Sequence, residues 1–387
     1  MKLKVVISFF VLAVMFSLNS AAQNECSVIL REAQDEFDAG NLDAVIEMLY
    51  PCIETGFNKN EKVQAYRLIA LTFLFDDKID QAKATMYELL KLNPEFEINE
   101  VVDPIEFKEL HKKFITYPIF SYGFIAGLNF TKVNLRETYG VDNFESSGIY
   151  SSNGIGYQFG AHGAVVIKPR FYANLEVFFK GTKFQFNDNL EFHSFMSNQD
   201  TLSAFGTLQS NENHSWLSIP FSLTYDFPLN KKMLTYARLG ATSNLLLSAQ
   251  STLDRRYEEK YSLPNISRGA VNMKDNRNDL NFWLTAGTGI KYKIPRGNLF
   301  FDIRYNHALK KANDPTARYS NPELLYQYFY VDDDFKMSDL CFSIGYTRHI
   351  YDPKIKGENI HDLVKNKTAE SNGVKSNTKG TRYKKFK

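Results

Sequence analysis

Residues 120 to 351 alternate between apolar and polar side chains with a period of two, which predicts β-strands. Each alternating run has at least 12 residues, against roughly 5 to 6 in an ordinary strand. A tilted strand that crosses a bilayer needs roughly 9 to 11. The lengths therefore favour strands that cross a membrane. The eight runs are 120–133, 155–167, 171–186, 215–227, 234–248, 281–294, 299–310 and 337–351.

The connections between these runs are alternately long and short. The short ones are "KPR", "PLNKKM" and "PRGN", whereas the long ones fill 134–154, 187–214, 249–280 and 311–336. An up-and-down barrel with tight turns at one end and large loops at the other gives this pattern. A Greek-key sandwich gives no such regular alternation of long and short connections. The sequence therefore predicts an eight-stranded up-and-down barrel.

The two faces of the runs differ in size and polarity. One face is aromatic and aliphatic, as at Phe124, Leu128 and Phe130, and the other carries Gly, Ser and Thr with a few charges. The interior of an eight-stranded barrel is just wide enough for packed side chains, so the bulky face is predicted to point outward into lipid. The predicted ion network of the lumen is Glu176, Lys180, Asp226, Arg238, Asp302 and Arg304.

Residues 25 to 116 change to a helical period and predict two helical hairpins. The second hairpin resembles a tetratricopeptide repeat, because Ala82 follows the turn at Asp77 by five residues and Pro94 follows Ala82 by twelve. The first hairpin is looser, since Val45 stands where that repeat has a small residue. A tetratricopeptide-like helical domain is therefore predicted over residues 23–116.

The boundaries of these helices follow from turn and capping residues. Gly40 is predicted to end the first helix, and Pro51 to end the second. A fifth helix is expected from "DPIEFKEL", with Asp103 as its N-cap and Pro104 at its first position. Such a helix would cover the last apolar face of the array.

The first residues predict export. Lys2 and Lys4 precede an apolar run over 5–18, and small residues at 20–22 suit a signal peptidase, so residues 1–22 are predicted to be a signal peptide. That run is shorter than the roughly 18 residues of a transmembrane helix. We expect the outer membrane of a Gram-negative bacterium. Both termini would be periplasmic, because an even number of strands returns the chain to the side of the short turns.

Charge and cysteine content divide the chain further. Residues 23–116 hold 10 Lys or Arg against 19 Asp or Glu, whereas residues 352–387 hold 10 against 4, in a chain of net charge +2. The basic segment 352–387 is predicted to be a disordered periplasmic tail. Cys26 and Cys52 lie 14 residues before and 12 after Gly40. They are predicted to form a disulfide in the oxidising periplasm, with Cys341 alone in the lumen.

Four stretches of the strand region resemble a known family. They are "WLSIPFSLTYDF" at 216–227, "GTGIKYKI" at 287–294, "FFDIRYNHAL" at 300–309 and "LCFSIGYTRHIY" at 340–351. Residues 117–351 resemble the PorT-type outer-membrane β-barrel family, and the basic tail and the helical domain are additions to its usual pattern. The resemblance implies a transmembrane barrel that serves envelope machinery such as type IX secretion or barrel assembly.

Motifs of catalysis are not found in the sequence. It has no hydrolase elbow, zincin helix, paired CxxC or P-loop, and "VDDDF" at 331–335 is expected to be a solvated acidic loop. A lipid-modifying barrel would need a Ser and a His side by side on its lipid-side rim. His214 and Ser215 cannot form that pair, because adjacent residues of a strand point to opposite faces. We therefore predict no enzyme, no catalytic, cofactor-binding or metal-binding residues, and no open pore.

The predicted function is that of a non-enzymatic outer-membrane barrel that anchors a periplasmic protein-interaction module. It would act as a scaffold or accessory of secretion or barrel assembly. Its partners would be outer-membrane lipid and, through the helical domain, periplasmic or outer-membrane proteins, but not nucleic acid. One alternative is a stand-alone outer-membrane protein whose extracellular loops bind external ligands. Another is a lipid-modifying barrel enzyme.

Overall fold

A computed structural model describes residues 20–140, 148–152, 154–194, 202–257 and 265–357. The chain divides into two compact units. One is formed by 1–118 together with 351–387, and the other by 119–350. The predicted signal peptide therefore lies almost entirely outside the described residues. Among the described residues, no helix is both long enough and apolar enough to span a bilayer.

The first unit is helical, as predicted. Gly40 has a positive φ of 85° at the turn between the first two helices, a conformation that glycine adopts without strain. The Asn58 side chain accepts from the backbone amide of Glu61, which caps the third helix. Buried Leu49, Leu68 and Met86 form part of one apolar core. The helices are α2 (Ser20–Asp38), α3 (Leu42–Thr55), α4 (Lys59–Phe75), α5 (Ile79–Leu92) and α6 (Ile105–Lys112).

Two predicted helix boundaries are wrong. Helix α3 continues through Pro51 to Thr55, because the next two residues, Cys52 and Ile53, are buried in the core of the unit. That burial offsets the hydrogen bond that proline cannot donate. Asp103 does not cap α6. Its carboxylate accepts from Arg67 Nε at 2.8 Å instead, a charge-assisted bond that is stronger than an ordinary cap.

The basic tail is ordered where it begins, contrary to its predicted disorder. Residues of β12 (Lys354–Ile355) pair antiparallel with β1 (Phe114–Ile115). Ile355 is buried in the core of the helical unit, and its burial fixes this short stretch. Residues 358–387 of the predicted tail lie outside the described residues.

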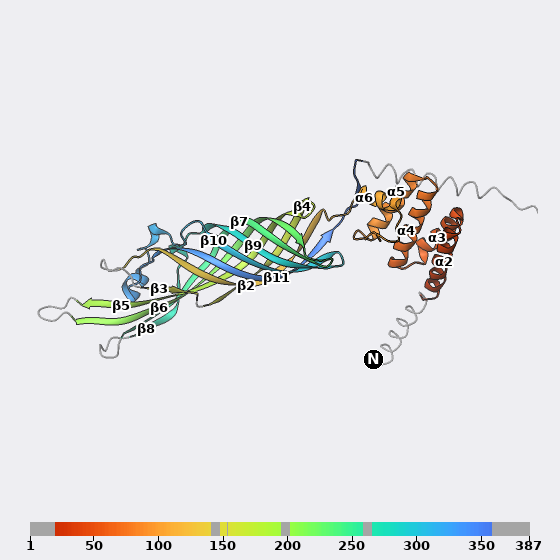
Figure 1. Ribbon diagram of the computed structural model, residues 1–387. Coiled ribbons are helices and arrows are strands. Elements are labelled where there is room, and N and C mark those ends of the chain that lie inside the picture. The colour runs from red at the N-terminus through yellow and green to blue at the C-terminus, as the bar shows by residue number, and fades with distance from the viewer. Residues whose placement is uncertain (1–19, 141–147, 153, 195–201, 258–264, 358–387) are drawn as a thin grey trace, which may run out of the picture. The chain divides into compact units, whose positions relative to one another are not determined.

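The second unit contains the eight predicted strands in the predicted order (Figure 1). All neighbouring strands are antiparallel, and long strands that are consecutive along the chain are neighbours in the sheet. The long strands are β2 (Phe120–Glu137), β4 (Ile155–Lys168), β5 (Phe171–Ser194), β6 (Leu202–Pro228), β7 (Met233–Tyr257), β9 (Leu280–Ile294), β10 (Gly297–Ala308) and β11 (Asp334–Ile350).

Pairing of the long strands forms a ring. They pair in the order β5-β4-β2-β11-β10-β9-β7-β6, and β6 pairs with β5 as well, over residues Phe171 to Ser194 of β5. The first and last strands pair from Phe120 opposite Ile350 onward. Each long strand therefore has two antiparallel neighbours. This is the arrangement of an eight-stranded up-and-down barrel.

Two of the predicted long loops are largely strand, which corrects the sequence analysis. Strands β5, β6 and β7 have 24, 27 and 25 residues and continue well past the other strands at the long-loop end (Figure 1). Short strands β3 (Ile149–Ser151) and β8 (Ile266–Asn272) pair with β5 and β7. The polar sequence of 202–214 predicts no strand. Backbone hydrogen bonds to β5 on one side and to β7 on the other keep it extended.

A second apolar core closes the long-loop end of the barrel. Trp216, Trp283 and Phe335 are among its buried residues. The 3-10 helices η3 (Lys274–Asn276) and η4 (Pro315–Ala317) and the π-helix η5 (Leu324–Tyr328) lie in the connections at this end, and Leu324 and Tyr328 of η5 join the core. We call this packed region, residues 273–279 and 311–335, the loop cap.

Candidate functional site

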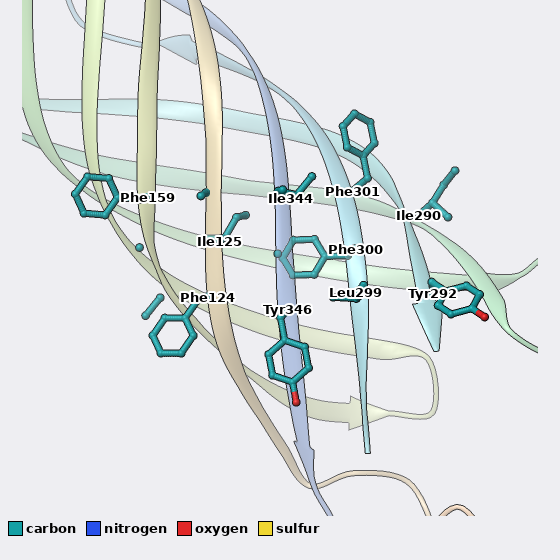
Figure 2. A pocket seen from close by; sticks show the side chains of 14 residues that line it. Phe124, Ile125, Phe159, Ile290, Tyr292, Leu299, Phe300, Phe301, Ile344 and Tyr346 are labelled. Atoms are coloured by element: carbon teal, nitrogen blue, oxygen red, sulfur yellow. The ribbon is translucent and has the colours of Figure 1, made fainter. Parts of the chain in front are cut away.

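The outer face of the barrel carries a continuous apolar surface, which we call the belt. Phe124 and Ile344 expose 70% and 65% of their surface. Figure 2 shows side chains of five adjacent strands around an open apolar hollow of this surface. Exposed apolar patches of such extent are rare on soluble proteins. Every long strand contributes exposed apolar residues to the belt. These include, one from each strand in chain order, Phe124, Phe159, Leu175, Phe221, Leu239, Leu284, Phe301 and Ile344.

Four of the six predicted lumen residues form one buried ion network. Glu176 accepts from both Arg238 and Arg304, and a second bond from Arg304 Nη2 to Glu176 Oε1 measures 3.1 Å. Arg304 also pairs with Asp302, which accepts from the hydroxyl of Tyr236 at 2.6 Å. These groups are at most 9% exposed. Each charge is therefore compensated inside the barrel, as buried charges must be.

The other two predicted lumen residues have partners that the sequence analysis missed. Lys180 pairs with Asp339, and its ammonium lies 4.4 Å from the centroid of the Trp283 ring. Asp226 accepts from Lys291 at 2.7 Å. Both missed residues occupy inward positions of their strands, so the period-two pattern could have placed them. Which charge meets which depends on the register between strands that are distant in sequence.

A second ion network, which the sequence did not predict, joins the loop cap to Glu212 and His214 of β6. The Arg277 guanidinium lies between two carboxylates, 2.6 Å from Glu212 and 2.8 Å from Asp332. His214 Nε2 lies 2.5 Å from Glu212 Oε1, and the Tyr330 hydroxyl donates to Asp332 at 2.9 Å. All five groups are buried. The Nε2 atom of His214 therefore takes part in this buried network through Glu212.

The expectation of a solvated acidic loop at 331–335 is wrong. Asp332, Asp333 and Asp334 are each at most 2% exposed. Asp334 is paired with Arg318 and Lys311 of the same connection, and Asp332 with Arg277 of another loop, so these cations compensate the acidic run. Asp333 instead accepts from the Tyr139 amide at 2.8 Å and from the Tyr150 hydroxyl at 3.1 Å. Among the described residues, no group of three His, Cys, Asp or Glu side chains is placed to hold a metal.

Asp333 makes the loop cap sensitive to pH. Burial raises the pKa of this carboxyl from 3.8 to about 6. The folded-state pKa lies above the unfolded value, so the neutral Asp333 carboxyl favours the folded state of the loop cap. This contribution to the free energy of unfolding is fully present below pH 3.8 and is lost as pH rises through about 6. We expect amide exchange over residues 329–335, corrected for intrinsic rates, to accelerate on the order of 100-fold across this window.

Asp333→Asn provides the matching variant. It should remove this pH dependence and slow exchange of the same amides at neutral pH, while amides of α5 behave alike in both proteins. An unchanged pH dependence in the variant would show that another group titrates.

Cys26 and Cys52 are joined by a disulfide between α2 and α3, and the remaining cysteine, Cys341, is buried and free. The bridge spans 26 positions of the chain. Loop closure of this length stabilises a fold by roughly 3 kcal/mol in the chain-entropy model.

Replacing both Cys26 and Cys52 with serine should therefore lower the free energy of unfolding of the helical unit by about 3 kcal/mol. Urea-dependent proteolysis of the full chain, read on peptides from 25–112, measures the loss. Cys341→Ser is the control for thiol removal in the barrel, and equal urea midpoints for the double variant and the wild type would contradict the prediction.

A Ser–His contact that the sequence analysis missed lies on the outward face of the barrel. His307 Nδ1 is 2.8 Å from Ser338 Oγ. The two residues are directly opposite each other on β10 and β11. Their separation of 31 positions in the sequence hides the pair from any search for short motifs. The register of the last two strands would have revealed it.

Comparisons with known proteins give remote structural likenesses. No family model and no curated protein matches the chain. The outer membrane protein OprG from Pseudomonas aeruginosa is similar with a TM-score of 0.30 and 11% identity, over 61% of this chain and 98% of that one. The attachment invasion locus protein Ail of Yersinia pestis has a TM-score of 0.25 and 11% identity, over 59% and 97%. Neisserial surface protein A has 0.26 and 14%, over 59% and 97%. Likenesses this remote assign no function to the chain.

Proposed function

We propose that this chain is an outer-membrane β-barrel protein that anchors a helical protein-interaction module on the periplasmic side. The observation that carries the membrane assignment is the apolar belt, which runs over all eight long strands. Only lipid accepts so continuous an apolar surface, since water would penalise every exposed ring. Paired charges and polar side chains fill the inside, as expected for a small transmembrane barrel.

The proposed partner of the helical unit is a protein of the envelope. Helical hairpins stacked side by side bind extended peptides or helices in many repeat proteins, and the acidic charge of residues 23–116 favours a basic partner. The disulfide suits an oxidising compartment. The resemblance of 117–351 to PorT-type barrels supports service to secretion or barrel assembly. The alternative of a stand-alone protein is supported by the sheet of β5 to β8, which extends past the belt at the long-loop end.

Photocrosslinking in intact cells tests the two alternatives. A benzophenone amino acid would replace Phe75 or Val101 of the helical unit, which are 60% and 93% exposed, or Tyr326 of the loop cap, which is 78% exposed. Discrete protein adducts from the first two positions are expected for a periplasmic scaffold. Adducts from Tyr326 alone would favour the stand-alone protein. The substitution at Leu229, 58% exposed in a short turn, serves as the matched control for chance encounters.

A further inference from the structure

Ser338 and His307 lie on the lipid-facing side of the barrel wall. The neighbouring residues Asp339 and Asn306 are buried in the lumen, whereas Leu340 and Tyr305, two positions from the pair, are exposed in the belt. Since side chains alternate along a strand, Ser338 and His307 share the face of the belt. Their direct pairing across β10 and β11 brings Oγ and Nδ1 to 2.8 Å. A hydroxyl and an imidazole thus meet on the outside of the barrel.

A third side chain orients the hydroxyl. Asn134 Nδ2 lies 2.8 Å from Ser338 Oγ. An amide nitrogen can only donate, so it occupies one lone pair of the oxygen and leaves the hydroxyl proton to be donated to Nδ1 of His307. A hydroxyl that donates to an imidazole is the arrangement of a nucleophile and its general base. A second polar donor beside the nucleophile is also what a developing oxyanion requires.

The depth of this triad in the proposed membrane is that of the lipid ester groups. One step towards the middle of the barrel, the outward residues Phe130, Leu340 and Tyr305 are apolar. At the level of the triad, Ser338 is opposite Lys132, and one step farther out Lys336 is opposite Asn134. On β2 and β11 the belt therefore ends at Ser338, where hydrocarbon gives way to the polar interface, whereas exposed Leu309 and Phe282 continue it one step beyond His307. The acyl esters of membrane lipids lie at that boundary, and the two lysines suit their phosphate groups.

We propose that Ser338, His307 and Asn134 form a site that hydrolyses acyl esters of phosphate-bearing membrane lipids. Ser338 Oγ attacks the ester carbonyl carbon while its proton passes to His307 Nδ1. The bond from that carbon to the alcohol oxygen breaks, and the leaving oxygen takes the proton from His307. Asn134 donates to the carbonyl oxygen while it carries negative charge.

Water completes the cycle. It attacks the acyl group on Ser338, gives its proton to His307, and the acyl–Oγ bond breaks as Oγ recovers that proton. The products are a fatty acid and a lipid with one free hydroxyl. This activity rests on the belt facing lipid, but it is independent of any partner of the helical unit. Ser338 is buried, at 1% exposure, so acylation requires a neighbouring side chain to turn aside.

Covalent labelling of the full chain in lipid vesicles tests the site. A fluorophosphonate with a long alkyl chain reacts with an activated serine and stays attached, and peptide mapping locates it. We expect modification at Ser338, none in Ser338→Ala, and labelling slowed on the order of 100-fold or more in His307→Gln. Ser343→Ala, which removes a buried hydroxyl from the lumen face of the same strand, should label at the wild-type rate.

Fatty-acid release from phospholipid vesicles that contain each protein gives the second measurement. The wild type should release fatty acid, and Ser338→Ala should not. Heat-dependent gel mobility shows whether each variant is folded, and the wild-type labelling position decides even if a variant fails to fold. A folded wild type that shows no modification at Ser338, or labelling that His307→Gln leaves unchanged, would establish the triad as a purely structural contact and overturn the proposal.

Discussion

Glu176→Ala is expected to destabilise the barrel by about 3 to 5 kcal/mol, because it removes the shared partner of two buried cations. Arg238 and Arg304 both donate to this carboxylate. Asp302 would remain for Arg304, but no second carboxylate is seen in contact with Arg238 among the described residues. An uncompensated buried guanidinium then opposes folding. Urea unfolding of the protein in lipid vesicles, followed by heat-dependent gel mobility, measures the loss.

Glu137→Ala is the matched control. This glutamate is exposed at the end of β2, so its removal should change the free energy of unfolding by no more than about 0.5 kcal/mol. If both variants unfold at the same urea concentration, the lumen network does not hold the barrel together. Glu176→Gln should fall between them, since the amide oxygen still accepts one hydrogen bond.

Ile344→Arg is expected to destabilise the barrel by about 2 to 4 kcal/mol if this residue lies near the middle of the bilayer. Ile344 is exposed in the belt on β11, and a guanidinium there would lose its hydration. On a surface that faces water, the same substitution would change stability by only about 0.5 kcal/mol. The same urea titration in vesicles measures the difference.

Leu229→Arg makes the same chemical change at the edge of the barrel. Leu229 is 58% exposed in the short turn between β6 and β7, so its arginine should cost about 0 to 1 kcal/mol near the interface. If both substitutions lower the free energy of unfolding equally, the cost of arginine does not depend on depth, and this result would contradict a barrel that spans a bilayer.

The strand set could be predicted because local chemistry specifies it. A period-two pattern fixes which face each residue takes, and a slip of one residue would reverse every side chain. The short turns then fix the partners of each strand. Strand 202–214 could not be predicted in this way, because its polar sequence has no apolar face. Pairing with β5 and β7 decides its conformation.

The candidate sites were less predictable than the fold, since they depend on contacts between distant strands. The period-two pattern predicts that Glu176 and Arg304 point inward. Their pairing with each other depends on the closed ring of strands, which brings β5 and β10 to face each other. The acidic run 332–334 was misassigned because its partners Lys311, Arg318 and Arg277 are brought to it only by the folding of the loops. Pro51 is a local signal that predicts the end of a helix. Burial of the residues that follow it overrides this signal, and the helix continues.

Spin labels placed one at a time at residues 340 to 346 of β11 measure most directly whether the belt faces lipid. The labels would be attached to introduced cysteines in a Cys341→Ser background, with the protein in lipid vesicles. Collisions with oxygen, which concentrates in hydrocarbon, are compared with collisions with a water-soluble nickel complex. We predict high oxygen and low nickel accessibility at 340, 342, 344 and 346, and low values for both at the odd positions. Nickel accessibility at the even positions as high as that of a label at exposed Lys232 would contradict a belt in contact with lipid.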